Sequence, residues 1–361
     1  MQMQLNQYCK KLNMKKKNTS AKKKIPNFYF NKLKNRKIKK IYLEFKKNIN
    51  EFSNKKLCVA VSGGSDSLAL TFLVKCMSLE TKIDYLYCHV DHKLRSESSK
   101  EASKTKKLLK DHGINLHILK WAGKKKISNI QEQAMLNRYN LLFKESEKRN
   151  IDIILTAHHV DDLYENFFIR LLRGSGLKGL ISFKNKVSRI DKNKNSLILR
   201  PLLNISKKDL IYVSKNTFGS FVNDSSNNNE KFLRIHVRKI INKLFSNKKN
   251  NLNIGLALSN LDRSNEAIEY YVKKNIEMNV KSRFGNKVII SDNFFNHPDE
   301  VVFRSLNTVL NNFSKKTKLT RGSKIVNLYK SYRNSEKYFK TTLSGCIFEK
   351  VSKSLIISRE I

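Results

Sequence analysis

The sequence predicts an α/β protein in which a doubly wound parallel sheet is followed by a smaller α+β domain. Short apolar runs alternate with helical stretches through the first two thirds of the chain. Two adjacent glycines stand between the first apolar run and the helix after it. The chain has 361 residues, of which 40% are hydrophobic, so it is long and apolar enough for two or three domains with cores.

Each apolar run of the first part is expected to be a strand, and each stretch after it a helix. The predicted strands are 57–61, 83–90, 114–119, 151–156 and 197–203. An amphipathic helix over residues 38–52 precedes them. The later helices are expected from the glycines to 77, over 96–110, 129–148 and 160–172, from 206, and over 232–245. This alternation predicts parallel strands, with an active site at their carboxyl ends.

Three parts are expected along the chain. Residues 1–30 are rich in Lys and Asn without periodicity and are predicted to be a flexible extension. Residues 31–247 form the sheet domain with its leading helix, and residues 248–361 a mixed α+β domain. Within the last part we expect a linker at 248–251, helices at 253–279 and 299–311, and weaker strands near 288–290 and 347–357.

The chain is strongly basic, with 73 Lys and Arg against 30 Asp and Glu, a formal charge of +43. Such a charge favours a polyanionic partner such as nucleic acid. Only 16 of the basic residues are arginine, and abundant Lys, Asn and Ile are also typical of an AT-rich genome, so both explanations stay open. No apolar run reaches the length of a membrane span, and no signal peptide is evident, so we expect a cytoplasmic protein without a membrane partner.

Five cysteines lie far apart in the chain, at Cys9, Cys58, Cys76, Cys88 and Cys346. They form no C-x-x-C pair and no Cys/His zinc spacing. Cys58 and Cys88 lie in predicted strands, so buried free thiols in a reducing compartment are expected.

The segment from residue 62 to residue 67 gives the strongest indication of chemistry. Two glycines between a strand and a helix let successive backbone N–H groups form an anion nest, and the helix N-terminus adds its dipole. A carboxylate in such a nest would repel a phosphate unless Mg²⁺ lies between them, which makes Asp66 a candidate metal ligand. The candidate anion-binding residues are Ser62, Gly63, Gly64, Ser65, Asp66 and Ser67. An ordinary capped turn is the alternative.

Residues 59–67 resemble the pyrophosphate loop of the N-type ATP pyrophosphatases, the PP-loop superfamily, whose fold is HUP-like. Further segments resemble, in chain order, the tRNA(Ile)-lysidine synthase family within it, and the resemblance covers about residues 57–245. The segments are His89-Val90-Asp91-His92 with Leu94-Arg95; Arg138-Tyr139; residues 156–162 with Glu165; residues 171–177; Arg200-Pro201-Leu202-Leu203; Asp224 with Asn227; and Phe232, Arg234 and Arg238. Departures from the family pattern are Lys93, Leu163, Asn166 and Ser225.

The resemblance implies a ligase reaction. ATP adenylates O2 of the wobble cytidine in an isoleucine tRNA with a CAU anticodon, and free L-lysine then displaces AMP at C2. It implies ATP and Mg²⁺ as cofactors and leaves the oligomeric state open, with a homodimer as one option. The implied catalytic residues are Asp66, His158 and Asp162; Arg138 joins the ATP site; Asp162 and Glu165 bind lysine; and Arg173, Arg200, Arg234 and Arg238 contact tRNA.

The residues themselves suit that task. Asp162 and Glu165 are three apart on a predicted helix, so both carboxylates share a face and can receive an ammonium group. Six of the 16 arginines lie in or directly beside the motif segments, where a planar cation suits phosphate: Arg138, Arg170, Arg173, Arg200, Arg234 and Arg238. The alternatives are structural: Asp161 and Asp162 at a helix start can complement the helix dipole, Arg173 can belong to a helix cap, and Arg234 with Arg238 can be a solvated face. A transition-metal site of His89, Asp91, His92, His158 and His159 is a further alternative.

Two other functions compete with the ligase. Another ATP pyrophosphatase, such as a tRNA thiolase, commonly uses a cysteine pair near its site, and Cys58 and Cys88 offer none. A non-catalytic RNA-binding protein on the same fold would have no need of Asp66, Asp162 and Glu165 together.

Overall fold

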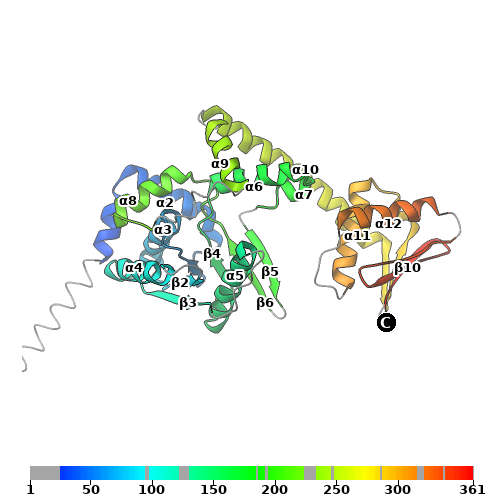
Figure 1. Ribbon diagram of the computed structural model, residues 1–361, viewed down its shortest axis with the longest axis horizontal. Helices are drawn as coiled ribbons and strands as arrows, with labels where there is room; N and C mark the ends of the chain where they lie inside the picture. Colours follow the sequence, from blue (N-terminus) through cyan, green and yellow to red (C-terminus); the bar gives the residue numbers. More distant parts are fainter. Residues whose placement is uncertain are drawn as a thin grey trace, which may run out of the picture. The chain divides into compact units, whose positions relative to one another are not determined.

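The computed structural model describes residues 25–93, 97–121, 130–183, 186–191, 194–222, 233–244, 248–284, 287–314, 321–335 and 338–360 (Figure 1). Contacts within the chain divide it into two compact units, residues 1–246 and residues 247–361. No helix in the described ranges combines the length and apolarity needed to cross a bilayer.

The first unit is built on a six-stranded sheet. Its strands are β1 (Cys58–Ala60), β2 (Leu86–Asp91), β3 (Leu116–Lys120), β4 (Ile153–Leu155), β5 (Lys186–Asp191) and β6 (Lys194–Leu199), in the order β3-β2-β1-β4-β6-β5. The five predicted strands are confirmed, and all of them pair in parallel. β5 was not predicted, and it pairs antiparallel with β6 at the edge.

The strand order creates a crevice beside β1. From β1 the chain builds outward through β2 to β3, and then returns to place β4 on the other side of β1. The loops that leave the carboxyl ends of β1 and β4 therefore turn to opposite faces of the sheet. Open α/β sheets bind ligands at such a switch point. The two most informative sequence segments, 62–67 and 156–162, follow these two strands.

Helices cover both faces of this sheet, as the predicted doubly wound fold requires. The helices are α2 (Arg36–Ile49), α3 (Ser65–Thr81), α4 (Ser98–Asp111), α5 (Ile130–Lys148) and α8 (Lys207–Phe218), with the short η1 (Asn50–Phe52) after α2. Leu57 and Val59 pack in one core cluster with α2, α3 and α8, whereas Cys58 and Cys88 pack in another with α5. This alternation follows from the two-residue period of a strand. Four cysteines, Cys58, Cys76, Cys88 and Cys346, are free and buried as predicted, and Cys9 lies outside the described residues.

The prediction of a flexible extension is wrong for residues 25–30, which belong to a helix over 25–33. Tyr29 is fully buried, its ring stacks on Phe72 at 5.5 Å, and its hydroxyl donates to the carbonyl oxygen of His112 at 2.9 Å. Apolar residues recur at three- and four-residue spacing here, at Ile25, Phe28, Tyr29 and Leu33, but the segment is only nine residues long and directly follows a run of three lysines. Residues 1–24 lie outside the described part of the chain.

The second unit is an α+β domain, as predicted. Its antiparallel sheet has the order β7-β8-β11-β10-β9, with β7 (Val280–Phe284), β8 (Lys287–Ser291), β9 (Lys340–Leu343), β10 (Cys346–Val351) and β11 (Ser354–Arg359). Its helices are α10 (Lys248–Asn279), α11 (Asp299–Phe313) and α12 (Gly322–Asn334), with η3 (Asp292–Phe295) between β8 and α11. The side chains of Val302, Leu306 and Ile325 join Phe348 and Ile357 in its core.

Two predictions for this unit need correction. Residues 248–251, predicted to be a linker, form the first turn of α10, since they contain neither Pro nor Gly to end a helix. The single strand expected over 347–357 is a hairpin of β10 and β11, because the chain turns at residues 352–353, where Ser352 has a φ of 52°. α12 and the strands β7 and β9 were not predicted.

Candidate functional site at the carboxyl ends of the first and fourth strands

The glycine loop, residues 62–67, connects β1 to α3. Gly63 has a φ of 89°, and a Cβ built on it would lie 2.5 Å from Oγ1 of Thr105, so only glycine fits there. The hydroxyl of Ser67 accepts a hydrogen bond from the backbone N–H of Gly63 and donates one to the carbonyl oxygen of Gly64, both at 3.0 Å. Ser67 is buried, so its hydroxyl shapes the loop. The loop is therefore held in shape by its own side chains.

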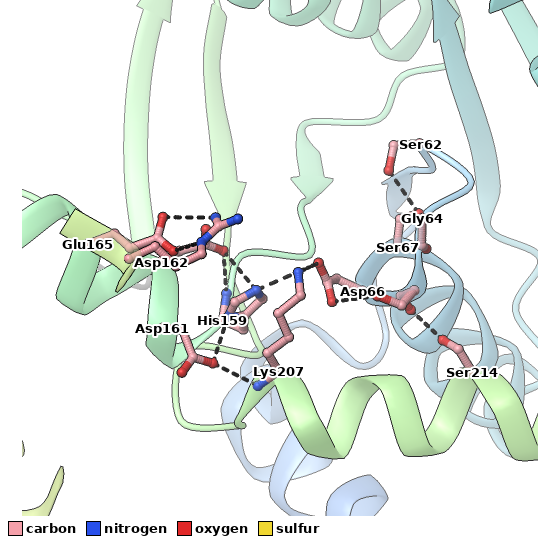
Figure 2. Close-up of polar contacts among 12 residues, drawn as sticks. Ser62, Gly64, Asp66, Ser67, His159, Asp161, Asp162, Glu165, Lys207 and Ser214 are labelled. Atoms are coloured by element: carbon pink, nitrogen blue, oxygen red, sulfur yellow. Dashed lines mark hydrogen bonds and ion pairs between the residues drawn. The ribbon is translucent and has the colours of Figure 1, made fainter. Parts of the chain in front are cut away.

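Figure 2 shows how the first turn of α3 completes the cradle. Gly64 precedes the helix in an extended conformation, and the Ser65 hydroxyl donates to Oδ1 of Asp66 at 3.0 Å. Ser214 of α8 donates to the carbonyl oxygen of Ser65 and fixes α8 against this turn. Ser62 is exposed at the rim. Backbone N–H groups, a hydroxyl and a helix N-terminus thus meet at one place, which suits a phosphate.

Asp66 is held by two cations that come from other elements. Nζ of Lys207, at the start of α8, lies 3.1 Å from Oδ2 of Asp66, and Nε2 of His159 lies 3.6 Å from the same oxygen. Burial opposes ionisation of this carboxyl, but the nearby imidazolium of His159 and the charge of Lys207 outweigh it and lower the pKa of Asp66 to about 2. Asp66 is therefore a carboxylate at neutral pH.

His159 lies at the centre of the acidic side chains (Figure 2). Its ring is 3.3 Å from Asp161 and 3.4 Å from Asp162, in addition to its contact with Asp66. Burial disfavours the charged ring, yet the carboxylates of Asp161, Asp66 and Asp162 close around it raise the pKa of His159 to about 9. Oδ2 of Asp161 also accepts the backbone N–H of Lys207 at 2.8 Å, which satisfies the first turn of α8. His159 is thus an imidazolium that joins the glycine loop to α6 (Val160–Leu172).

The structure brings Asp162 and Glu165 together, and α9 (Leu233–Leu244) covers them with two arginines. Nη2 of Arg234 lies 2.9 Å from Oδ1 of Asp162, and its Nε lies 2.7 Å from Oε2 of Glu165. Arg238 donates twice to Glu165, whose side chain is 1% exposed. The backbone N–H of His159 donates to Oδ2 of Asp162 at 3.1 Å. Both guanidinium groups that were predicted to contact tRNA are therefore engaged by the two carboxylates predicted to bind lysine.

A second group of side chains lies around His158. Its Nδ1 is 2.9 Å from Oγ1 of Thr156, and its ring meets the edge of Phe183 at 5.2 Å. The guanidinium of Arg200 lies over the same aromatic ring, 4.3 Å from its centre. Burial lowers the pKa of His158 to about 4, so this histidine is neutral where His159 is charged. The two adjacent histidines therefore have different chemistry.

Arg138 and Arg173 lie outside these two groups. Nε of Arg138 donates to Nε2 of His92 at 3.4 Å, at the carboxyl end of β2. Arg173 is exposed at the end of α6, before Gly174 with its φ of 67°. Asp224, Ser225, Asn227, Phe232 and Arg95 lie outside the described residues.

The described side chains of this site balance in charge. Four carboxylates meet four cations: Asp66, Asp161, Asp162 and Glu165 with His159, Lys207, Arg234 and Arg238. No group of three or more His, Cys, Asp and Glu among the described residues is arranged to hold a metal by itself. Asp66 nevertheless fits Mg²⁺, which takes one or two protein carboxylates and completes its shell with phosphates and water.

Sequence reasoning missed three residues of this site. Lys207 had no assigned role, Asp161 was considered only as a complement of the helix dipole, and His159 was named only as an alternative metal ligand. His159 and Asp161 belong to the His-His-Val-Asp-Asp segment, so its density of titratable residues was a usable signal. Lys207 follows a serine that caps α8, and nothing in that local pattern indicates a contact with the glycine loop.

Comparison with known proteins agrees with this geometry. Residues 34–244 match the PP-loop domain family. The chain is 34% identical over 335 residues to the tRNA(Ile)-lysidine synthase of Orientia tsutsugamushi, covering 89% of this chain and 74% of that one. It is 31% identical over 319 residues to the tRNA(Ile)-lysidine synthase of Wolbachia pipientis, covering 87% and 72%.

Among solved structures, the U34-tRNA thiolase NcsA from Methanococcus maripaludis with its [4Fe-4S] cluster shares the fold. The TM-score is 0.52 at 17% identity, over 62% of this chain and 79% of that one. Fold, loop geometry and sequence together lead to one family: the chain belongs to the tRNA(Ile)-lysidine synthases, built on a PP-loop domain.

Proposed function

We propose that this protein ligates free L-lysine to C2 of the wobble cytidine in the isoleucine tRNA with a CAU anticodon. In the first step O2 of the cytidine attacks the α-phosphorus of ATP and diphosphate leaves. In the second step the lysine ε-amine attacks C2, and AMP leaves with the former O2. The tRNA then reads AUA instead of AUG. The tRNA(Ile)-lysidine synthase relatives support this reaction.

One observation carries the proposal: the glycine loop and the Asp162/Glu165 pair lie on either side of His159 at the same end of the sheet. The reaction needs an anion site for ATP next to a receptor for an ammonium group. A phosphate cradle and a carboxylate pair joined by one imidazolium meet both needs.

ATP binding is assigned to the glycine loop, and the match to the PP-loop domain family supports it. The backbone of residues 62–66 would receive the phosphates, and Arg138 would add a planar cation. Asp66 would hold Mg²⁺, which supplies positive charge to the phosphates when bound. Lys207, already beside Asp66, is placed to contact the same phosphates.

Lysine binding is assigned to Asp162 and Glu165. Lysine arrives as an ammonium ion and must lose a proton before its nitrogen can attack. Asp162 is the better base of the two, because Glu165 is 1% exposed and held by Arg238, whereas the side chain of Asp162 is 14% exposed. Neutral His158, with Nδ1 engaged by Thr156, would present its other ring nitrogen to the cytidine or its adenylate.

Contacts to tRNA are proposed for Arg173, Arg200 and residues 248–361. Arg200 over Phe183 forms a flat cationic and aromatic surface of the kind on which nucleobases stack. The formal charge of +43 would add non-specific attraction to the tRNA backbone. ATP, free lysine and tRNA meet in the cytoplasm, where we place the protein.

The test is incorporation of labelled lysine into a tRNA(Ile) transcript with a CAU anticodon, in the presence of ATP and Mg²⁺. We expect lysine transfer with release of one AMP for each lysine incorporated. Absence of transfer by folded protein, with a substrate that a lysidine synthase relative does modify, would refute the proposal.

Asp162→Asn is the matched variant for the role of the base. We expect it to bind ATP normally and to lose lysine transfer by at least about a hundredfold, since general bases contribute about 10²- to 10⁴-fold. Asp152→Asn makes the same chemical change at an exposed position and should retain transfer. Equal activity of the two variants would remove Asp162 from the mechanism.

A further inference from the structure

The carboxylates proposed to bind lysine are already occupied by cations of the chain itself. Arg234 bridges Oδ1 of Asp162 and Oε2 of Glu165 at 2.9 and 2.7 Å. Arg238 holds both oxygens of Glu165. An incoming ammonium group therefore meets a site whose charge is already neutralised, and it must replace a resident cation to bind.

The two arginines differ in how firmly they are placed. Glu165 is 1% exposed, and a carboxylate buried so deeply needs a permanent cationic partner. Among the described residues, Arg238 donates both of its side-chain hydrogen bonds to Glu165. Arg234 donates to both Asp162 and Glu165, and its side chain is 47% exposed, whereas that of Arg238 is 32% exposed. Arg238 is thus the fixed partner of Glu165, and Arg234 is the cation that can leave.

At Asp162, the contact that an incoming ammonium group would replace is the one with Arg234. Its Oδ2 accepts the backbone N–H of His159 at the start of α6, and the His159 ring lies 3.4 Å from the same oxygen. Its Oδ1 is the atom that contacts Arg234. An ammonium group that binds Oδ1 would sit beside the guanidinium, and two like charges at that separation repel. An ammonium group at Oδ1 would therefore compete with Arg234 for this carboxylate.

We propose that Arg234 leaves Asp162 when lysine binds and pairs instead with the α-carboxylate of the same lysine. The expelled guanidinium needs a new anion, and the substrate brings one with it. A planar fork of N–H donors matches a carboxylate in two parallel hydrogen bonds. Arg234 would then be the residue that selects an amino acid over a simple diamine, an assignment that rests on the proposed function and refines it.

The test compares lysine with cadaverine, which has the same chain and amine but no carboxylate. The KM for labelled lysine and the inhibition constant of cadaverine are measured for the wild type and for Arg234→Gln, at saturating ATP and tRNA. We expect the KM for lysine to rise about tenfold or more, as for loss of a hydrogen bond to a charged group. The inhibition constant of cadaverine should stay or fall, because no guanidinium has to be displaced.

Two further variants separate the loss of the guanidinium group from the loss of a positive charge. Arg234→Lys retains the charge without the fork and should raise the KM for lysine less than Arg234→Gln does. Lys208→Gln removes one exposed charge on neighbouring α8 and should leave the lysine-to-cadaverine ratio unchanged. Thermal melting of each variant verifies that it folds.

Two outcomes contradict the assignment. Equal weakening of lysine and cadaverine by Arg234→Gln would mean that Arg234 only positions Asp162 and Glu165. An unchanged ratio with a raised KM for tRNA would return Arg234 to tRNA binding. If the wild type transfers no lysine at all, the proposed function itself fails, and that result precedes any comparison of variants.

Discussion

At the scale of single residues, Gly63 and Gly64 are adjacent but differ in what they tolerate. Gly63 has a φ of 89° and no room for a Cβ beside Thr105. Gly64 has a φ of −75°, and its Cβ would find its nearest neighbour, Oγ of Ser62, at 3.7 Å. An alanine substitution at Gly63 therefore tests the loop conformation, and the same substitution at Gly64 is its control.

We expect Gly63→Ala to destabilise the first unit by about 1 to 3 kcal/mol and to weaken ATP binding, because it strains the loop. Gly64→Ala should change stability by less than about 1 kcal/mol, since the site is compatible with a side chain. Thermal melting and titration with ATP measure both effects. Similar losses in the two variants would argue against a special role for the conformation of Gly63.

His159 gives the site a predictable pH dependence. Its pKa is raised from 6.5 to about 9, so the charged ring stabilises the fold fully below pH 6.5, and this contribution is lost as the pH rises through 9. Between these values the wild type should lose about 1 to 3 kcal/mol more unfolding free energy than His159→Gln does. Denaturant unfolding at the two ends of this pH range measures the difference. Parallel pH profiles would show that the imidazolium does not contribute.

At the scale of elements, α9 is attached to α6 through charges as well as apolar contacts. Val237 and Ile241 are buried, and Arg238 holds Glu165. Removing one partner of a buried ion pair leaves the other unpaired and commonly costs about 3 to 5 kcal/mol. The attachment of this helix should therefore be sensitive to a single substitution.

Glu165→Gln is expected to increase amide hydrogen exchange in α9 while exchange in α11 and α12 stays at the wild-type rate. The change leaves the Arg238 guanidinium without its carboxylate, so the helix opens more often. Glu145→Gln is a control, since it breaks the ion pair between Glu145 of α5 and Arg149 just after that helix, which is more exposed than the pair of Arg238 with Glu165. Unchanged exchange in α9 would mean that the apolar contacts alone hold it.

At the scale of the whole molecule, we expect residues 25–33 to contribute to the stability of the first unit, and we test this by comparing two N-terminal truncations. Tyr29 is buried against Phe72 and bonded to the backbone of His112. Deleting residues 1–33 should therefore lower stability by about 3 kcal/mol or more, as for loss of a large core side chain. Deleting residues 1–24 should leave the melting temperature nearly unchanged. Equal melting temperatures for both truncations would contradict the role of Tyr29.

The same shorter truncation tests the meaning of the net charge. Residues 1–24 contain eight lysines and no acidic residue. If these lysines bind the tRNA backbone, their deletion should reduce the slope of log affinity against log salt by about 0.7 to 0.9 for each phosphate that they neutralise. Filter binding at several salt concentrations gives the slope. An unchanged slope would assign the tRNA-binding charges to the rest of the chain.

Much of the fold could be predicted from local patterns. The five parallel strands and the helices between them follow from apolar runs and helical periodicity, because an element that is buried on one face repeats its apolar residues with its own structural period. β5 is mostly polar and pairs with the next strand in the chain, so no apolar run marks it. α12 does carry apolar residues at helical spacing, Ile325, Leu328, Tyr329 and Tyr332, a pattern that the prediction did not use. The helix over residues 25–33 was missed because it is short and adjoins a lysine run, and the first turn of α10 was missed because Lys-Lys-Asn-Asn carries no apolar period.

The sequence by itself determined the family, the glycine loop and the acidic pair on α6, because each depends on residue types at short spacing. Only the tertiary structure decided the electrostatic partners. Lys207 reaches Asp66 across 141 positions, and Arg234 reaches Asp162 across 72. Charge pairing depends on distance in space, which the strand order sets and local sequence does not contain. For that reason adjacent histidines differ in charge, and arginines expected to contact tRNA lie on the carboxylates proposed to bind lysine.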